Sequence, residues 1–290
     1  MTDAVGFIGT GAIGTAMILR LLDVGHSVVV NNRTRMNAEA AVSAGAEWVD
    51  ARRTVLEHCP LVLTCLRDTA ATEEVYLGDG GLLGYATAGQ LFVEHGTFAP
   101  ALARRIATAA QEVGAEFLAA PVSGGAAGAR TGSLVLMVGG GRAAFDLAKP
   151  VFDALSPSPT LVGGAAAGLE LKLVNQLLTS THMAVAGEAI GLLHKLGIDL
   201  AAAGELLPKG WAESAMLARA LDIVQRGELE GTGASIRGMA EVLELVEDLL
   251  VESATRAPVF ETGRSAFLEA VGRGLGEHDP AALYRMTEES

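Results

Sequence analysis

The chain has 290 residues, half of them hydrophobic, and its 34 acidic and 21 basic residues give a formal net charge of −13. This length predicts about two domains, each with enough apolar material to offset the entropy lost on folding. The acidic balance argues against a surface for nucleic acid or anionic membranes, which needs clustered lysine and arginine. We therefore expect neither nucleic acid nor a membrane as a partner.

The N-terminus and the cysteines indicate a cellular compartment. No basic segment precedes an apolar run at the start of the chain, so we expect no secretory leader. The longest uncharged stretches contain Gly or Pro and are too short for a spanning helix. Without a leader, the two cysteines, Cys59 and Cys65, are expected to be free, reduced thiols. These features predict a cytoplasmic protein.

Residues 1–163 alternate between short apolar runs and helical patterns. The apolar runs are nearly continuous, as in parallel strands that are covered on both faces. The alternation predicts an α/β domain with a doubly wound parallel sheet. Strands are expected at 5–8, 27–30, 61–65, 90–94, 116–118, 134–138 and 160–162, and the clearest helices at 12–24, 100–113 and 142–155.

Strand patterns end near residue 163. Residues 165–195 have the pattern of one long helix, and the remainder has the pattern of shorter helices interrupted at Gly197, 208–210, 227–233 and Pro258. We predict an all-α domain at 164–290, which follows the α/β domain at 1–163 and begins with a long interdomain helix.

A glycine-rich turn follows the first predicted strand, in the order Gly9-Thr10-Gly11-Ala12-Ile13-Gly14. Gly9 allows a tight turn, Gly11 removes a side chain that would block a pyrophosphate, and Gly14 lets the next helix approach the strand. The N-terminus of that helix offers free N–H groups to phosphates. Because the turn lies between a strand and a helix, it predicts a dinucleotide site rather than a glycine-rich turn without a ligand.

The second predicted strand ends in Asn32, Arg33 and Thr34. An NAD site usually has an acidic residue near this point, which accepts from the ribose 2′-hydroxyl. These side chains instead offer donors, and Arg33 can pair with a 2′-phosphate or stack on adenine. The segment favours NADP over NAD, while the alternative is a solvated turn with ordinary surface arginines.

A second glycine-rich segment, Ser123-Gly124-Gly125, follows the fifth predicted strand. Ligands of open α/β sheets bind at the carboxyl ends of the strands. Here several backbone N–H groups and the Ser123 hydroxyl could bind a substrate carboxylate. The alternative is a flexible connection.

Lys172 lies near the start of the long helix and shares one face with Asn175, Gln176 and Thr179. Leu and Val flank this face, and a lysine among apolar residues is costly unless it is paired or functional. Desolvation would lower its pKa toward a range in which it can exchange protons. The alternative is a lysine that extends its amine into water.

Together these segments resemble the β-hydroxyacid dehydrogenase family. The family includes 3-hydroxyisobutyrate dehydrogenases, tartronate semialdehyde reductases, glyoxylate/succinic semialdehyde reductases and, more distantly, 6-phosphogluconate dehydrogenases. The resemblance rests on residues 6–14, on Asn32-Arg33-Thr34, on 121–125 with Gly128 and Gly132, and on 168–176, in the family's order.

The resemblance implies that hydride passes between NADP and a small carboxylate-bearing semialdehyde or 3-hydroxyacid, with Lys172 as the general acid and base. It places Asn175 and Gln176 against the lysine or the substrate oxygen, and Ser123, Gly124 and Gly125 against the carboxylate. It also implies a homodimer or homotetramer and no metal.

The resemblance assigns three further residues to the cofactor. Thr97 lies near the nicotinamide and the substrate, and Leu66 approaches the cofactor ribose through its backbone. Arg237 takes the place of a family lysine that reaches toward the cofactor.

The chain departs from the family at three sites. Ala119 stands where the family often has Asp, just before the segment 120–125. Gly96-Thr97 replaces a Ser-Thr pair and follows an unusual Glu94-His95, and Arg237-Gly238 replaces a Lys-Asp pair, which removes the partner of the cation.

Two other functions stay open: an imine reductase-like NADPH enzyme, against which Lys172 and Ser123 count, and a non-catalytic NADP-binding protein.

Overall fold

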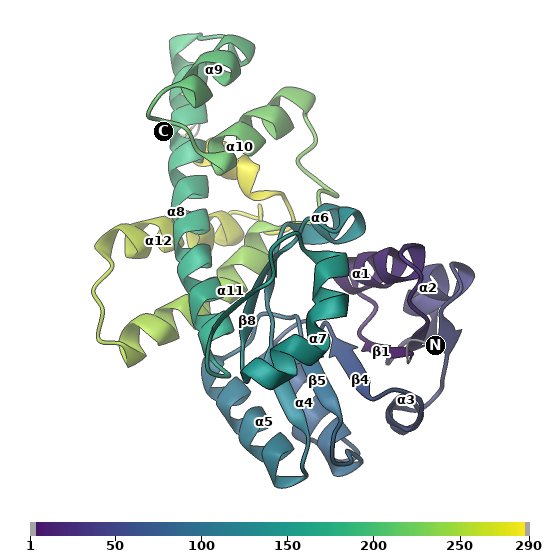
Figure 1. Cartoon of the computed structure of the whole chain (residues 1–290). Helices are drawn as coiled ribbons and strands as arrows, with labels where there is room; N and C mark the ends of the chain where they lie inside the picture. The colour runs from purple at the N-terminus through teal and green to yellow at the C-terminus, as the bar shows by residue number, and fades with distance from the viewer. Residues whose placement is uncertain (1–3, 288–290) are drawn as a thin grey trace. The chain divides into compact units, whose positions relative to one another are not determined.

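The computed structural model describes residues 4–287 and forms two compact units (Figure 1). They comprise Met1–Lys172 and Leu173–Ser290, and they divide within one continuous helix, α8 (Ala167–Leu196). The sequence-based boundary between residues 163 and 164 stays a prediction, because a helix that belongs to both units marks no sharp border.

The first unit is built on a nine-stranded sheet in the order β3-β2-β1-β4-β5-β6-β8-β7, with β9 paired to β8. The five pairs from β3 to β6 are parallel, and the chain reverses its direction of winding between β1 and β4. This confirms the doubly wound sheet. The strands are β1 (Val5–Ile8), β2 (Val28–Asn31), β3 (Glu47–Trp48), β4 (Leu61–Thr64), β5 (Leu91–Glu94), β6 (Glu116–Ala119), β7 (Val122–Ser123), β8 (Val135–Gly139) and β9 (Thr160–Gly163).

Helices cover both faces of the sheet because successive strand residues point to opposite sides and both sides are apolar. Phe7, Leu63 and Leu118 face one layer, formed by α1 (Ala12–Asp23), α6 (Gly125–Thr131) and α7 (Arg142–Leu155). Phe92 and Phe117 face the other layer, formed by α3 (Arg52–His58), α4 (Thr69–Leu77) and α5 (Pro100–Glu112). Short elements complete this unit: η1 (Arg35–Ala38), α2 (Glu39–Ser43) and η2 (Leu82–Gly84).

Two features of this unit differ from the sequence-based expectation. Strand β8 runs antiparallel to β6, and an apolar run has the same pattern in either direction. The segment 125–131 is a helix, α6, although its glycines favour a loop. Packing outweighs this propensity, since Gly128 and Ala129 are buried and Arg130 forms an ion pair with Asp23 of α1.

The second unit contains only helices among its described residues, as predicted. After Leu173 in α8 come α9 (Leu200–Leu206), η3 (Leu207–Lys209), α10 (Ala215–Arg226), α11 (Ile236–Glu252), α12 (Pro258–Gly272) and η4 (Pro280–Thr287). Its core includes Ile190, Leu243, Phe267 and Leu283, all at most 3% exposed. Over residues 4–287, no helix has the length and hydropathy needed to cross a bilayer.

Candidate active site

The carboxyl ends of β2, β1, β4, β5 and β6 lie side by side along one edge of the sheet, because these strands are parallel neighbours. The predicted site segments of the first unit follow these strands. They are Asn32–Thr34 after β2, the turn at 9–14 after β1, Leu66 after β4, Thr97 after β5 and Ser123–Gly125 after β6. The fold therefore brings them to a single edge, where ligands of such sheets bind.

The glycine turn after β1 has the shape that a pyrophosphate site needs. Gly9 has φ = 101°, and a Cβ there would lie 2.4 Å from the carbonyl oxygen of Cys65. A Cβ on Gly14 would lie 2.1 Å from the carbonyl oxygen of Gly9, whereas a Cβ on Gly11 would meet no atom within 4 Å. Gly9 and Gly14 are thus required by the fold, and Gly11 leaves open space outside it.

Two polar features of this turn also fit a bound dinucleotide. Gly11 caps α1 without a side-chain hydrogen bond, so the first N–H groups of α1 have no side-chain cap. The Thr10 hydroxyl oxygen is buried and has no hydrogen-bond partner among the described residues. A phosphate at the helix N-terminus would satisfy such donors.

Asn32 and Arg33 lie beside a cavity of about 340 Å³ at the end of β2. The Asn32 amide accepts from the backbone N–H of Thr10 at 3.3 Å and donates to the Thr34 carbonyl at 2.9 Å, which ties this segment to the glycine turn. Arg33 is exposed, and within residues 4–287 no ion pair is recorded for its guanidinium. Arg52, Arg53 and Asp50 also line the cavity.

Leu66 and Thr97 are half-buried at the ends of β4 and β5. The carboxylate of Glu94 lies between them and accepts from the backbone N–H groups of Leu66, at 3.0 Å, and Gly96, at 2.6 Å. Burial raises the pKa of Glu94, although these bonds and one from the Thr64 hydroxyl favour the charged form. The sequence interpretation gave Glu94 no role, because its burial depends on neighbours that are distant in the sequence.

The segment 123–125 exposes its backbone at the end of β6. Gly124 has φ = 122° and Gly125 has φ = 61°, conformations that side chains other than glycine rarely adopt. Ser123 is half-buried, and both glycines are exposed. This segment can therefore present its backbone to a ligand without obstruction by side chains.

Lys172 is buried within α8, with only 7% of the residue exposed. Desolvation lowers its pKa from 10.5 to about 8. Gly168 lies one turn earlier, where a Cβ would be 2.7 Å from the carbonyl oxygen of Ala119 at the end of β6. Since residues i and i+4 share a helix face, Lys172 projects from the face that packs on the carboxyl edge of the sheet.

Asn175, Gln176 and Arg237 belong to the second unit. Asn175 follows Lys172 on the same helix face, and its side-chain oxygen is buried without a partner among residues 4–287. The Gln176 amide lies 3.8 Å from the sulfur of Met239. Arg237, in the first turn of α11, donates to Glu277 at 2.8 Å, so the expectation that its partner is missing was wrong. Glu277 is distant in the sequence and could not be found from the local motif.

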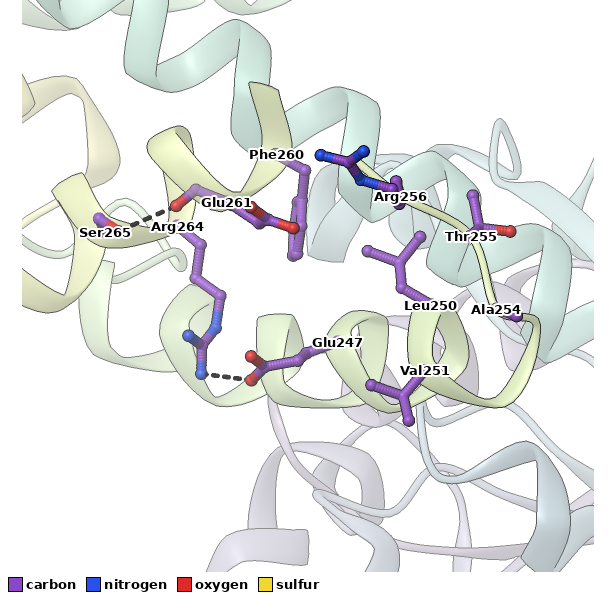
Figure 2. Close-up of a pocket in the computed structure, with 10 residues that line it drawn as sticks. All are labelled: Glu247, Leu250, Val251, Ala254, Thr255, Arg256, Phe260, Glu261, Arg264 and Ser265. Carbon is purple, nitrogen blue, oxygen red and sulfur yellow. Dashed lines mark hydrogen bonds and ion pairs between the residues drawn. The ribbon is translucent and has the colours of Figure 1, made fainter. Parts of the chain in front are cut away.

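A second pocket, of about 570 Å³, contains none of the predicted site residues. It lies between α11 and α12, where Arg264 forms an ion pair of 2.7 Å with Glu247 (Figure 2). Phe260, Leu250 and Val251 supply apolar surface there. Acidic and basic side chains are mixed around this pocket, so we assign no function to it. In the described part of the chain, no three His, Cys, Asp or Glu residues gather where they could hold a metal ion.

Two family models match consecutive parts of the chain. Residues 4–164 match the NAD-binding domain of 6-phosphogluconate dehydrogenase. Residues 166–287 match a family described as the NAD-binding part of NADP-dependent 3-hydroxyisobutyrate dehydrogenase. The chain belongs to the β-hydroxyacid dehydrogenase family. The predicted resemblance is therefore confirmed, together with the Rossmann fold of the first unit and NAD(P) as the class of cofactor.

Relatives within the β-hydroxyacid dehydrogenase family differ in the substrate that their names state. The 2-hydroxy-3-oxopropionate reductase of Escherichia coli is 37% identical over 61% of this chain and 60% of its own length. Alignments with the curated relatives thus span about three fifths of their length.

Solved structures match over nearly the whole chain. Psf3 in complex with NADP+ and 2-OPP is 28% identical, with a TM-score of 0.91 over 98% of this chain and 99% of its own. A 3-hydroxyisobutyrate dehydrogenase from Salmonella typhimurium is 25% identical, with a TM-score of 0.89 over the same shares of the two chains. An imine reductase from Myxococcus stipitatus bound to NADP+ is also 25% identical but has a TM-score of 0.62.

Proposed function

We propose that this protein is an NADP-dependent oxidoreductase that acts on a small carboxylate-bearing semialdehyde or 3-hydroxyacid. The observation that carries the proposal is the buried Lys172, with its pKa lowered to about 8, on a helix face that packs at the carboxyl edge of a dinucleotide-binding sheet. A general acid and base works best when its pKa is close to the working pH.

The residues of this chain divide the work between proton transfer and orientation. NADPH, when bound, supplies the hydride for reduction. Protonated Lys172 donates to the carbonyl oxygen in reduction, and neutral Lys172 accepts the hydroxyl proton in oxidation. Ser123, Gly124 and Gly125 bind the carboxylate, and Asn175 and Gln176 orient the lysine or the substrate oxygen. Thr97 lies against the substrate and the nicotinamide.

The preference for NADPH over NADH rests on Asn32, Arg33 and Thr34. Asn32 and Arg33 line a cavity, Thr34 follows them with an exposed hydroxyl, and Arg33 is free to pair with a 2′-phosphate. The turn 9–14 holds the pyrophosphate, Leu66 contacts the ribose through its backbone, and Arg237 supplies a cation from the second unit. The Psf3 complex with NADP+ supports the same cofactor for this chain.

A stripe of exposed apolar residues on α8 supports a homodimer or homotetramer. Leu171, Leu178, Val185 and Leu192 recur at intervals of seven residues and are 43–58% exposed. A sustained seven-residue apolar repeat favours the packing of one helix against another. Light scattering should show an oligomer for the wild type and a smaller species for Val185→Glu.

A turnover screen tests the proposed function. Consumption of NADPH would be followed with glyoxylate, succinic semialdehyde, methylmalonate semialdehyde, tartronate semialdehyde and a cyclic imine. We expect turnover with at least one semialdehyde or oxoacid. Turnover with the imine alone would favour the imine reductase, which Lys172 and Ser123 argue against. NADPH binding without any turnover would indicate a non-catalytic binding protein.

A further inference from the structure

The end of β5 carries two buried ionisable residues that the proposed chemistry does not use. Glu94 is 0% exposed and His95 is 1% exposed. Burial of such groups is costly unless hydrogen bonds compensate for the lost water. Their bonding partners therefore indicate what the two side chains do.

The Glu94 carboxylate joins the segments that follow two neighbouring strands. It accepts from the backbone N–H of Leu66 after β4 and from that of Gly96 after β5. The Thr64 hydroxyl also donates to it and lies 2.6 Å from the hydroxyl of Tyr76. Leu66 and Thr97, the neighbour of Gly96, are the residues proposed to contact the ribose and the nicotinamide.

Gly96 and Glu94 depend on each other. A Cβ on Gly96 would lie 2.6 Å from Oε1 of Glu94 and 2.5 Å from the carbonyl oxygen of Leu66. The carboxylate therefore occupies space that a side chain at position 96 would need. This explains why glycine stands at position 96, two residues after Glu94, where the family has Ser.

His95 bonds to the segment that leads to Ser123. Its Nδ1 lies 2.9 Å from the carbonyl oxygen of Ala120, which can only accept, so Nδ1 carries the proton. The Ala120 N–H donates to the carbonyl of Glu94 at 2.7 Å. Both backbone polar groups of Ala120 are thus held by Glu94 and His95, two residues before Val122 and three before Ser123.

The environment of His95 keeps the imidazole neutral. Burial lowers its pKa to about 4, and the ring packs edge-on against Phe152 at a centroid distance of 6.3 Å. Its Nε2 is buried without a hydrogen-bond partner within residues 4–287. An apolar residue would avoid this unpaired nitrogen, so the Nδ1 bond to Ala120 is the interaction that histidine provides here.

We propose that Glu94 and His95 are positioning residues. Glu94 positions the backbone at Leu66 and Thr97, which contacts the cofactor. His95 positions the segment 123–125, which binds the carboxylate. Consecutive residues at the end of a strand point to opposite faces, so one dipeptide reaches both segments. The proposal rests on the proposed function for the identity of the two ligands.

Replacement of His95 tests the substrate half of the proposal. His95→Asn keeps an N–H donor near the place of Nδ1, whereas His95→Leu removes it. The probe is 3-hydroxypropionate, a small 3-hydroxyacid. Its dissociation constant would be measured on NADPH-saturated protein, where hydride transfer from the hydroxyacid is impossible, and that of NADPH on the free protein. We expect His95→Leu to lower the affinity for the probe about tenfold, as for one lost hydrogen bond. Its affinity for NADPH should stay within about twofold of the wild-type value. His95→Asn should restore most of the probe affinity.

Glu94→Gln tests the cofactor half and should give the opposite pattern. Leu66 and Gly96 both donate to Oε1 of Glu94, and the Thr64 hydroxyl donates to Oε2. A carboxamide has one acceptor oxygen and no charge, so it loses the bond from Thr64 and makes weaker bonds to the two backbone N–H groups. We expect NADPH to bind about tenfold more weakly, with a smaller change for the probe.

Three outcomes would overturn the positioning proposal. The first is an equal loss of affinity for both ligands in either variant. The second is a lower melting temperature with unchanged affinities for both ligands. The third is equal affinity for the probe in His95→Asn and His95→Leu. Failure of the proposed function would look different. The wild type would then bind NADPH without binding the probe or turning over any carboxylate, while the Glu94→Gln arm would still report on the cofactor half.

Discussion

Two cations at the sheet edge have opposite environments. Arg33 is exposed at the end of β2, whereas Lys172 is 7% exposed on the helix face that packs beside β6. The exposed guanidinium is accessible to an incoming phosphate, whereas burial lowers the pKa of the Lys172 amine to about 8. A cation that binds phosphate can therefore remain exposed to water, whereas a cation that transfers protons near neutral pH needs burial to lower its pKa.

The largest effect is expected at the buried cation. Lys172→Ala should lower turnover about 10²- to 10⁴-fold, the usual contribution of a general acid or base, and leave NADPH affinity nearly unchanged. Steady-state kinetics and fluorescence titration would measure the two quantities. Lys195→Ala is the matched control, because Lys195 is an exposed lysine on the same helix. Unchanged turnover in Lys172→Ala would refute the assigned role.

Two glycines of the turn after β1 separate folding from binding. Gly14→Ala places a Cβ 2.1 Å from the carbonyl oxygen of Gly9, so it should lower the free energy of unfolding by about 2 kcal/mol or more. In Gly11→Ala the new Cβ meets no protein atom within 4 Å, so the melting temperature of the free protein should not change. The affinity for NADPH should fall, because the Cβ enters the space assigned to the pyrophosphate. Thermal melts with and without NADPH measure both effects. A destabilised Gly11→Ala protein would contradict the assignment of that space to the cofactor.

The exposed cation should give a smaller and more selective effect. Arg33→Ala removes a charge-assisted bond to the 2′-phosphate, which is typically about 1.5–3 kcal/mol, and should weaken NADPH about 10- to 100-fold. NADH lacks that phosphate, so the affinity for NADH should change little. The ratio of the two dissociation constants measures the selectivity, and equal changes for both cofactors would remove the argument for the 2′-phosphate.

Local pattern was sufficient for most of the first unit and for the all-α character of the second. Gly9, Gly11 and Gly14 could be assigned because each position in the turn has its own steric requirement. Contacts between distant residues could not be predicted. Helix α6 depends on packing against α1, Glu277 reaches Arg237 from forty residues away, and Glu94 is defined by bonds to Leu66 and Thr64.

The pH dependence of wild-type kcat/KM tests the role of Lys172 most directly. Oxidation needs the neutral amine, so its rate should rise with pH and level off above about 8. Reduction needs the protonated amine, so its rate should fall as pH rises through the same value. Opposite profiles with a shared midpoint near pH 8, both lost in Lys172→Ala, would support Lys172 as the proton donor and acceptor. Profiles that are flat across this range, or that persist in the variant, would contradict it.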